Sequence, residues 1–99
     1  MKLSFKFKNI QSVPSDILSF FKEKFKKIEK ITKKEGEAFV NVELIKNKET
    51  KENKGLYKVK IFFDTPKRSA IVIYGFGKNF YQAISKAFKK LSSLVKRSK

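Results

Sequence analysis

The stretch ILSFFKEKFKKIEKI, residues 17–31, decides the fold class, because its apolar residues recur at the spacing of an α-helix. The residues that fall on one broad apolar face are Ile17, Leu18, Phe20, Phe21, Phe25, Ile28 and Ile31. The opposite side carries Lys22, Lys26, Lys27 and Lys30. Lys24 projects into the apolar face, which either snorkelling of its ammonium group or a specific contact would explain. The stretch predicts an amphipathic helix that covers another element.

The segment before this helix has the two-residue period of a half-buried strand. Its apolar positions are Leu3, Phe5 and Phe7, and they alternate with Lys2, Ser4, Lys6 and Lys8. Residues 13–16, Val-Pro-Ser-Asp, then end the strand and offer Ser15 as a candidate helix N-cap. Residues 33–36, which end in Gly36, close the helix.

Three strands are predicted after the helix, over residues 38–44, 57–63 and 70–74. The last of these, Ala-Ile-Val-Ile-Tyr, is a continuous apolar run of the kind expected for a strand buried on more than one side. Lys46 to Gly55 is rich in Lys, Glu and Asn, which predicts a long, mobile hairpin loop. The turn at residues 64–67, which contains Pro66, is tighter.

A second amphipathic helix is predicted from about Lys78 to Lys96. Its apolar stripe consists of Phe80, Ile84, Ala87, Phe88, Leu91, Leu94 and Val95. The order β-α-β-β-β-α predicts an α+β two-layer sandwich, in which two helices pack on one face of a four-stranded sheet. The first βαβ step implies a parallel strand pair with a right-handed crossover. We expect residues 1–99 to form a single domain, since two cores in a chain of 99 residues would each be too small.

The charge of the chain predicts a polyanionic partner. The formal net charge is +16, from 25 Lys and Arg residues against nine Asp and Glu residues. The last acid is Asp64, and residues 65–99 carry nine basic residues. This asymmetry favours a directed basic surface, and nucleic acid over an anionic membrane as its partner.

Several classes of chemistry are disfavoured by composition. The chain has no Cys and no His, which removes thiolate nucleophiles, disulfides and the commonest general base and transition-metal ligand. The carboxylates form no evident catalytic pair, and surface ion pairing is the better account of them. No apolar segment resembles a signal peptide or reaches the length of a membrane span. We expect a cytoplasmic protein that is no enzyme and needs no cofactor, metal or small-molecule substrate.

Gly75-Phe76-Gly77 precedes the second predicted helix and invites comparison with a phosphate-binding loop. The signal is weak, because a third glycine and a downstream acid are missing. A strand-to-helix turn that needs positive φ is the favoured interpretation. A backbone amide near an RNA phosphate at the helix N-terminus stays open.

The best functional signal is the basic arc of the second helix, which carries Lys78, Lys86, Lys89, Lys90, Lys96 and Arg97 and is free of acids. Like charges at i,i+3 and i,i+4 repel, so the arc is costly in isolation. A solvated face is one account, and phosphate contact with counterion release is the favoured one. Lysines bind phosphates as point charges, which predicts shape-based binding to structured RNA with steep salt dependence.

Local strings resemble the ribosome hibernation-promoting factor family, also called the ribosome-associated inhibitor or sigma-54 modulation domain. KFKKIE at residues 24–29 is similar to its first-helix pattern of Lys, aromatic or Leu, any residue, Lys, Leu and Glu. GKNFYQAI at residues 77–84, followed by Ala87 and Lys90-Leu91, resembles its Gly-x-Asp-Met-Tyr-x-Ala-Ile entry into the second helix. The resemblance covers essentially the whole chain, and it is to the short-form members.

The resemblance implies binding to the small ribosomal subunit in the channel of mRNA and of A- and P-site tRNAs, with contacts to ribosomal RNA. Such binding blocks translation and preserves idle ribosomes under stress or in stationary phase. The basic positions that match those of the family are Lys24, Lys27, Lys90, Arg97 and Lys99. We expect a monomer when free, and the small subunit or the whole ribosome as its partner.

The sequence departs from the family pattern at four positions. Asn79, Ser85 and Lys89 stand where acids are expected, and all three changes make the chain more positive. Ser93 stands where an Arg is common, which puts that one contact in doubt.

Two alternatives stay open. A double-stranded-RNA-binding module has the order α-β-β-β-α, which is contained in this one, although the extra N-terminal strand argues against it. A protein-interaction or transcription-regulator module is suggested only by the older regulatory name of the family.

Overall fold

The computed structural model describes residues 2–8, 10, 13–46 and 57–97, with the side chains of residues 96 and 97 left aside. The order β-α-β-β-β-α is confirmed, with a short 3-10 helix, η1, after the first α-helix. The elements are β1 (Lys2–Lys8), α1 (Ser15–Thr32), η1 (Lys33–Glu35), β2 (Phe39–Lys46), β3 (Tyr57–Thr65), β4 (Arg68–Gly77) and α2 (Phe80–Arg97). The predicted loop at residues 46–55 lies, after Lys46, outside the described residues.

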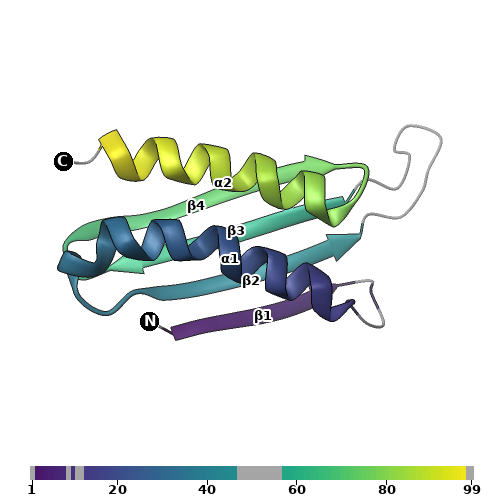
Figure 1. Ribbon diagram of the computed structural model, residues 1–99, viewed down its shortest axis with the longest axis horizontal. Helices are drawn as coiled ribbons and strands as arrows, with labels where there is room; N and C mark the ends of the chain where they lie inside the picture. Colours follow the sequence, from purple (N-terminus) through teal and green to yellow (C-terminus); the bar gives the residue numbers. More distant parts are fainter. Residues whose placement is uncertain (1, 9, 11–12, 47–56, 98–99) are drawn as a thin grey trace.

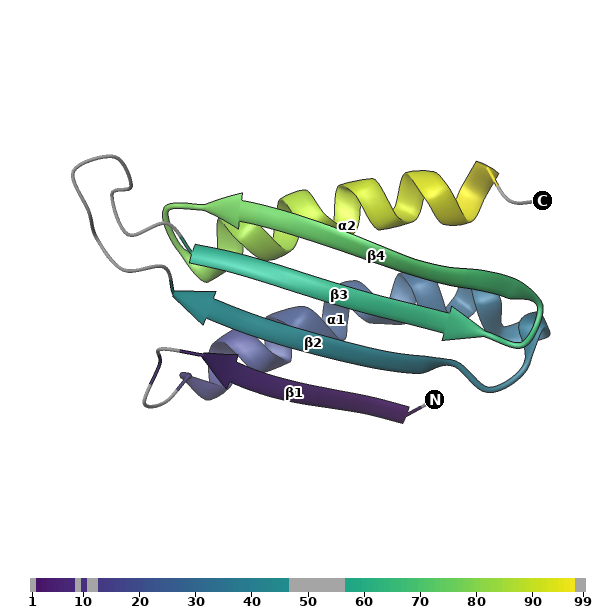
Figure 2. The same cartoon turned by 180° about the vertical axis from the view of Figure 1, so that it is seen from behind.

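The four strands form one sheet in the order β1-β2-β3-β4. β1 pairs with β2 in parallel, as predicted, and the other two pairs are antiparallel. Both helices lie on the same face of the sheet and run in the same direction (Figure 1). The opposite face carries no helix in the described part of the chain (Figure 2). The predicted α+β sandwich with two helices on one face is therefore confirmed.

The core lies between the helices and the sheet and is rich in phenylalanine. The rings of Phe21 and Phe88 join α1 to α2, with centroids 4.8 Å apart and planes at 61°. Phe25 touches Phe88 at 6.0 Å and Phe63 of β3 at 5.9 Å. All four rings are at most 4% exposed. Edge-on aromatic pairs of this kind add about 0.5–1.5 kcal/mol each beyond the area that they bury.

The prediction that residues 70–74 are buried on more than one side is wrong. β4 is an edge strand, and its side chains alternate between the core and the open face. Ile73 is 4% exposed, whereas its neighbours Val72 and Tyr74 are 46% and 38% exposed. The run is continuously apolar because large apolar side chains occupy both faces, although only one face is covered.

The prediction of Ser15 as N-cap is also wrong. α1 begins at Ser15 itself, Pro14 stands in the capping position with ψ 142°, and no side chain caps the helix. The predicted end of the helix is confirmed, since η1 follows and Gly36 takes φ 95°. Pro66 packs against this glycine, and a Cβ there would lie 3.2 Å from Pro66 Cγ.

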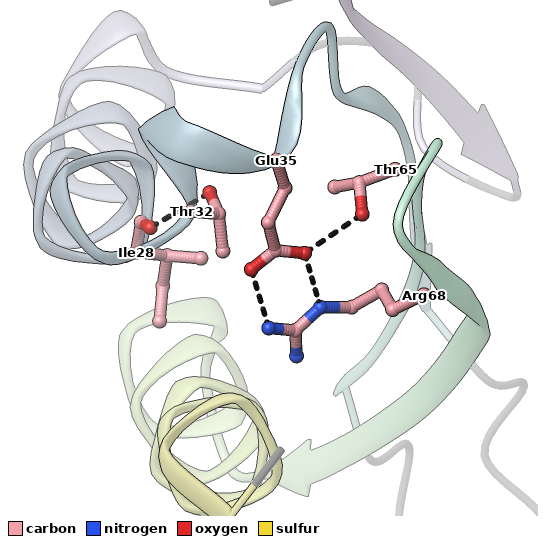
Figure 3. A network of polar contacts seen from close by, with 5 residues as sticks. All are labelled: Ile28, Thr32, Glu35, Thr65 and Arg68. Carbon is pink, nitrogen blue, oxygen red and sulfur yellow. Dashed lines mark hydrogen bonds and ion pairs between the residues drawn. The ribbon is translucent and has the colours of Figure 1, made fainter. Parts of the chain in front are cut away.

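A network of hydrogen bonds and an ion pair connects η1, which follows α1, to the β3–β4 turn (Figure 3). Arg68 binds both carboxylate oxygens of Glu35, with Nε donating to Oε1 at 2.6 Å and Nη2 to Oε2. Thr65 Oγ1 donates to the same Oε1 at 2.8 Å. The hydrogen bond from Arg68 lowers the pKa of Glu35, and the Thr65 hydrogen bond and the Arg68 charge act in the same direction against the effect of burial. The ion pair therefore favours the charged carboxylate in the folded state.

The lowered pKa of Glu35 makes part of the stability depend on pH. A carboxylate whose pKa is lower folded than unfolded stabilises the fold above the unfolded value, about pH 4, and loses that contribution as pH falls through the folded value. We expect Glu35→Gln to lower the free energy of unfolding by about 1–3 kcal/mol at neutral pH and by less near pH 3. Urea unfolding at both pH values measures this. Glu29→Gln, at an exposed site of α1, is the control, and an equal effect of both variants would contradict the account.

Candidate nucleic-acid interface

The start of α2 is set by two reciprocal hydrogen bonds. The Gln82 backbone N–H donates to Asn79 Oδ1 at 2.8 Å, and the Lys78 backbone N–H donates to Gln82 Oε1 at 2.7 Å. Asn79 is thus the N-cap, and the helix begins at Phe80, two residues later than predicted. The family pattern has an acid at position 79, and an Asn side chain offers an oxygen that accepts the same capping hydrogen bond. The replacement of the acid by Asn79 therefore preserves the start of α2.

The glycines before α2 act differently from the prediction. Gly75 and Gly77 belong to β4, and Gly36 is the glycine with positive φ in the described residues. A Cβ at Gly75 would lie 2.2 Å from the Ala83 carbonyl oxygen and 2.9 Å from Ala87 Cβ. These glycines therefore let α2 approach β4 closely. The Lys78 amide that could have bound a phosphate already donates to Gln82.

The flank of α1 that faces α2 carries both of its candidate RNA-binding lysines. The Phe20 ring meets the Tyr81 ring with centroids 5.1 Å apart and planes at 68°. Lys24 and Lys27 stand four and seven residues after Phe20, which places them on the same flank. Lys24 is half-buried and its Nζ lies 5.4 Å from the Phe20 ring centroid, so its ammonium group is held over this ring, whereas Lys27 is exposed.

The basic residues of α2 do not all face the same way. Lys86 and Lys89 are exposed on its outer side, and Lys78 is exposed just before the helix. Lys90 instead turns toward the sheet edge, where Nζ donates to the Tyr74 carbonyl oxygen of β4 at 3.1 Å. Lys96 and Arg97 lie in the last turn of α2 with side chains outside the description, and Lys99 lies outside the described residues.

The electrostatics of the helix layer favour an anion. α2 contains no acid, and a shallow hollow on α1 is lined by one acid and three lysines, namely Glu23, Lys24, Lys26 and Lys27, together with Phe20. The described residues hold no cluster of three or more acidic, His or Cys side chains that could bind a metal. No helix in the described part of the chain is long and apolar enough to cross a membrane.

The sequence-based list of binding residues omitted the lysines of the open sheet face. Lys6, Lys58 and Lys60 point away from the helices. Lys58 and Lys60 lie opposite Phe76 and Tyr74 of β4, whereas Lys6 lies opposite Glu43 of β2. In the sequence of residues 57–63, Lys58 and Lys60 alternate with the apolar residues Val59 and Ile61, and this two-residue period is the signal that could have identified them.

Comparison with known proteins agrees with this architecture. The family model described as sigma 54 modulation protein / S30EA ribosomal protein matches residues 3–99. The chain belongs to this family. The resemblance drawn from residues 24–29 and 77–84 is confirmed, and the family is ribosome-associated and not known as one of enzymes.

Solved structures show the same fold. The crystal structure of the N-terminal domain of Protein Y from Thermus thermophilus has a TM-score of 0.78 and 18% identity, with 100% of both chains covered. A ribosomal subunit interface protein from Coxiella burnetii has a TM-score of 0.77 and 14% identity, with 98% of this chain and 96% of that one covered. No curated protein sequence matches the chain.

The close approach of α2 to β4 can be tested at Gly75. We expect Gly75→Ala to lower the free energy of unfolding by about 1–3 kcal/mol or more, because the new methyl group would overlap the helix backbone. Ser85→Ala, on the exposed side of α2, is the matched control and should be near neutral or slightly stabilising. Thermal and urea unfolding measure both variants. A neutral Gly75→Ala would show that α2 does not depend on this contact.

Proposed function

We propose that the chain is a ribosome hibernation factor. It binds the small ribosomal subunit in the channel of mRNA and of A- and P-site tRNAs, which inhibits translation and preserves idle ribosomes under stress or in stationary phase. Residues 1–99 act as one ribosome-binding domain in the cytoplasm, monomeric when free. The observation that carries the proposal is the acid-free, lysine-rich outer side of α2 in a member of a ribosome-associated family.

The chemistry of binding follows from the residue types. Lysine ammonium groups contact phosphates as point charges, so they recognise the arrangement of an RNA backbone and little of its sequence. Release of condensed counterions makes such binding favourable and strongly dependent on salt. No cofactor or small molecule takes part, and the role requires no catalytic group.

The geometry divides the proposed RNA-binding lysines into two groups. Lys24 and Lys27 on α1 border the junction of the two helices, where Phe20 meets Tyr81. Lys86 and Lys89 lie on the outer side of α2. Because both helices occupy one face of the sheet and run in the same direction, one structured RNA surface can contact both groups (Figure 1).

Five further residues complete the proposed set. Lys78 precedes α2, and Lys96 and Arg97 end it, so contacts along the whole length of the helix are available. Lys99 extends the basic sequence by two more positions. Lys90 contributes less directly, because its ammonium group already donates to the Tyr74 carbonyl.

The proposal predicts that charge on α2 controls ribosome binding. We expect Lys86→Gln/Lys89→Gln to weaken binding to purified small subunits about tenfold or more. The dependence of log K on log salt should flatten by about one unit per lysine. Cosedimentation over a series of salt concentrations measures both quantities.

The control is Lys33→Gln/Lys34→Gln, which removes the same charge from the exposed residues of η1. It should leave binding close to that of the parent chain. Equal losses in both variants would mean that net charge alone acts, which contradicts the proposal. Equal affinity for plain duplex RNA and for small subunits would favour the double-stranded-RNA-binding alternative. Unchanged activity after loss of RNA binding would favour a protein-interaction or transcription-regulator module.

A further inference from the structure

The face of the sheet that the helices leave open has an unusual composition on its β3–β4 half. Its central side chains are Lys58, Lys60, Phe62, Val72, Tyr74 and Phe76, and we call this set the β3–β4 platform. Asp64 lies beyond Phe62 on the same face, near the end of β3. Val72, Tyr74 and Phe76 are 46%, 38% and 41% exposed. The view from behind shows these two strands side by side with no helix across them (Figure 2). Large apolar groups are thus exposed on a face that the described chain does not cover.

The strand register alternates charges and rings across the platform. Lys58 pairs with Phe76, Lys60 with Tyr74, and Phe62 with Val72. Residues opposite one another on antiparallel strands have Cβ atoms about 4.5–5.5 Å apart, so each lysine lies beside a ring. Lys58 Nζ lies 4.8 Å from the Tyr74 ring centroid and 5.7 Å from that of Phe76. The ammonium group is therefore held next to both rings.

We propose that the β3–β4 platform binds single-stranded RNA, with bases stacked on its rings and phosphates beside its lysines. Flexible single strands expose base faces that stack on aromatic side chains, and adjacent cations neutralise the backbone. A duplex does not offer this contact, because its base faces are already stacked on one another. This surface lies on the opposite side of the sheet from the helix lysines, so the inference goes beyond the proposed function and does not depend on it.

Charge distinguishes this occupant from a second copy of the chain. Lys6 of β1 adds another cation to the same face, and Glu43 of β2 lies between Lys6 and Lys60 in the register. Two copies packed face to face would bring their platform lysines together, which is unfavourable. A polyanion with aromatic bases complements both the charge and the rings.

The test keeps every charge and removes only rings, since a chain of net charge +16 attracts any polyanion. The probe is a fluorescein-labelled oligouridine of about twelve nucleotides, a length within the usual range for one single-strand site. We expect Tyr74→Leu/Phe76→Leu to weaken its binding about tenfold or more, as measured by fluorescence anisotropy. Leucine preserves an apolar side chain at both positions, and thermal unfolding checks that the variant is folded.

The matched control is Phe7→Leu, which removes an exposed ring of β1 on the side of the sheet away from the platform. It should leave oligouridine binding near that of the parent. The proposal is overturned if the parent does not bind oligouridine, if both variants lose affinity equally, or if neither does. A parent that self-associates in analytical ultracentrifugation, with self-association and not RNA binding lost in Tyr74→Leu/Phe76→Leu, would assign the platform to a second copy instead.

The same assay separates this inference from the proposed function. Lys86→Gln/Lys89→Gln should lose small-subunit binding. When Tyr74→Leu/Phe76→Leu is added to that variant, its affinity for oligouridine should still fall, as it does in the parent chain. If the oligouridine affinity does not depend on the rings of Tyr74 and Phe76 while ribosome binding is intact, only the platform proposal is refuted. If the chain shows no preference for small subunits over duplex RNA while the oligouridine affinity still depends on these rings, only the hibernation role is refuted.

Discussion

The aromatic contact among Phe21, Phe25 and Phe88 is the interaction on which the arrangement of the layers depends. Phe21 and Phe25 come from α1 and Phe88 from α2, and Phe25 also touches Phe63 of β3. One buried cluster thus holds both helices to each other and to the same face of the sheet. The net charge of +16 opposes compaction, so this apolar contact has to offset repulsion as well as chain entropy.

Placing both helices on one face divides the lysines into two populations. Lys26, Lys27, Lys86 and Lys89 are exposed on the helix layer, and the lysines of β1 and β3 lie on the open face of the sheet. Lys90 is the exception on α2, because it turns toward the edge of β4. α2 tolerates a charged side without acids because its other side is anchored by buried residues at helical spacing, from Ala83 to Val95. The charge pattern of the sequence therefore becomes two surfaces that point in opposite directions.

The sequence predicted the elements well and the contacts between them less well. Periodicity reveals which side chains share a face, and this was enough for six elements, their order and the parallel β1–β2 pair. It does not reveal which strand lies at an edge, so the apolar run of residues 70–74 predicts a strand buried on more than one side, whereas β4 lies at the edge. Nor does it reveal close approach: the need for glycine at position 75 comes from the Ala83 carbonyl of a helix that packs against it.

The candidate site shows the same limit at Lys90. Spacing along α2 places Lys90 beside Lys86 and Lys89, and no helical pattern predicts that its ammonium group reaches a backbone oxygen of β4. Side-chain direction on a helix can be inferred from the sequence, but a partner on another element requires the fold. The open-face lysines Lys58 and Lys60 illustrate a different limit, since their alternation with apolar residues indicates the side of a strand that faces away from the core, but not that this side is a binding surface.

The bond from Lys90 to the Tyr74 carbonyl also bears on how the open face can be used. An edge strand with exposed apolar side chains is a template for pairing with another strand, and a lysine at the edge is one of the features that oppose this. Here the lysine engages the main-chain oxygen of the residue whose ring lies on the platform. The edge of β4 is thereby partly occupied, while the rings of Tyr74 and Phe76 stay exposed on the adjoining face. At this part of the β4 edge, partners that bind by adding a strand are disfavoured, and partners that lie across the face and contact rings and ammonium groups are not.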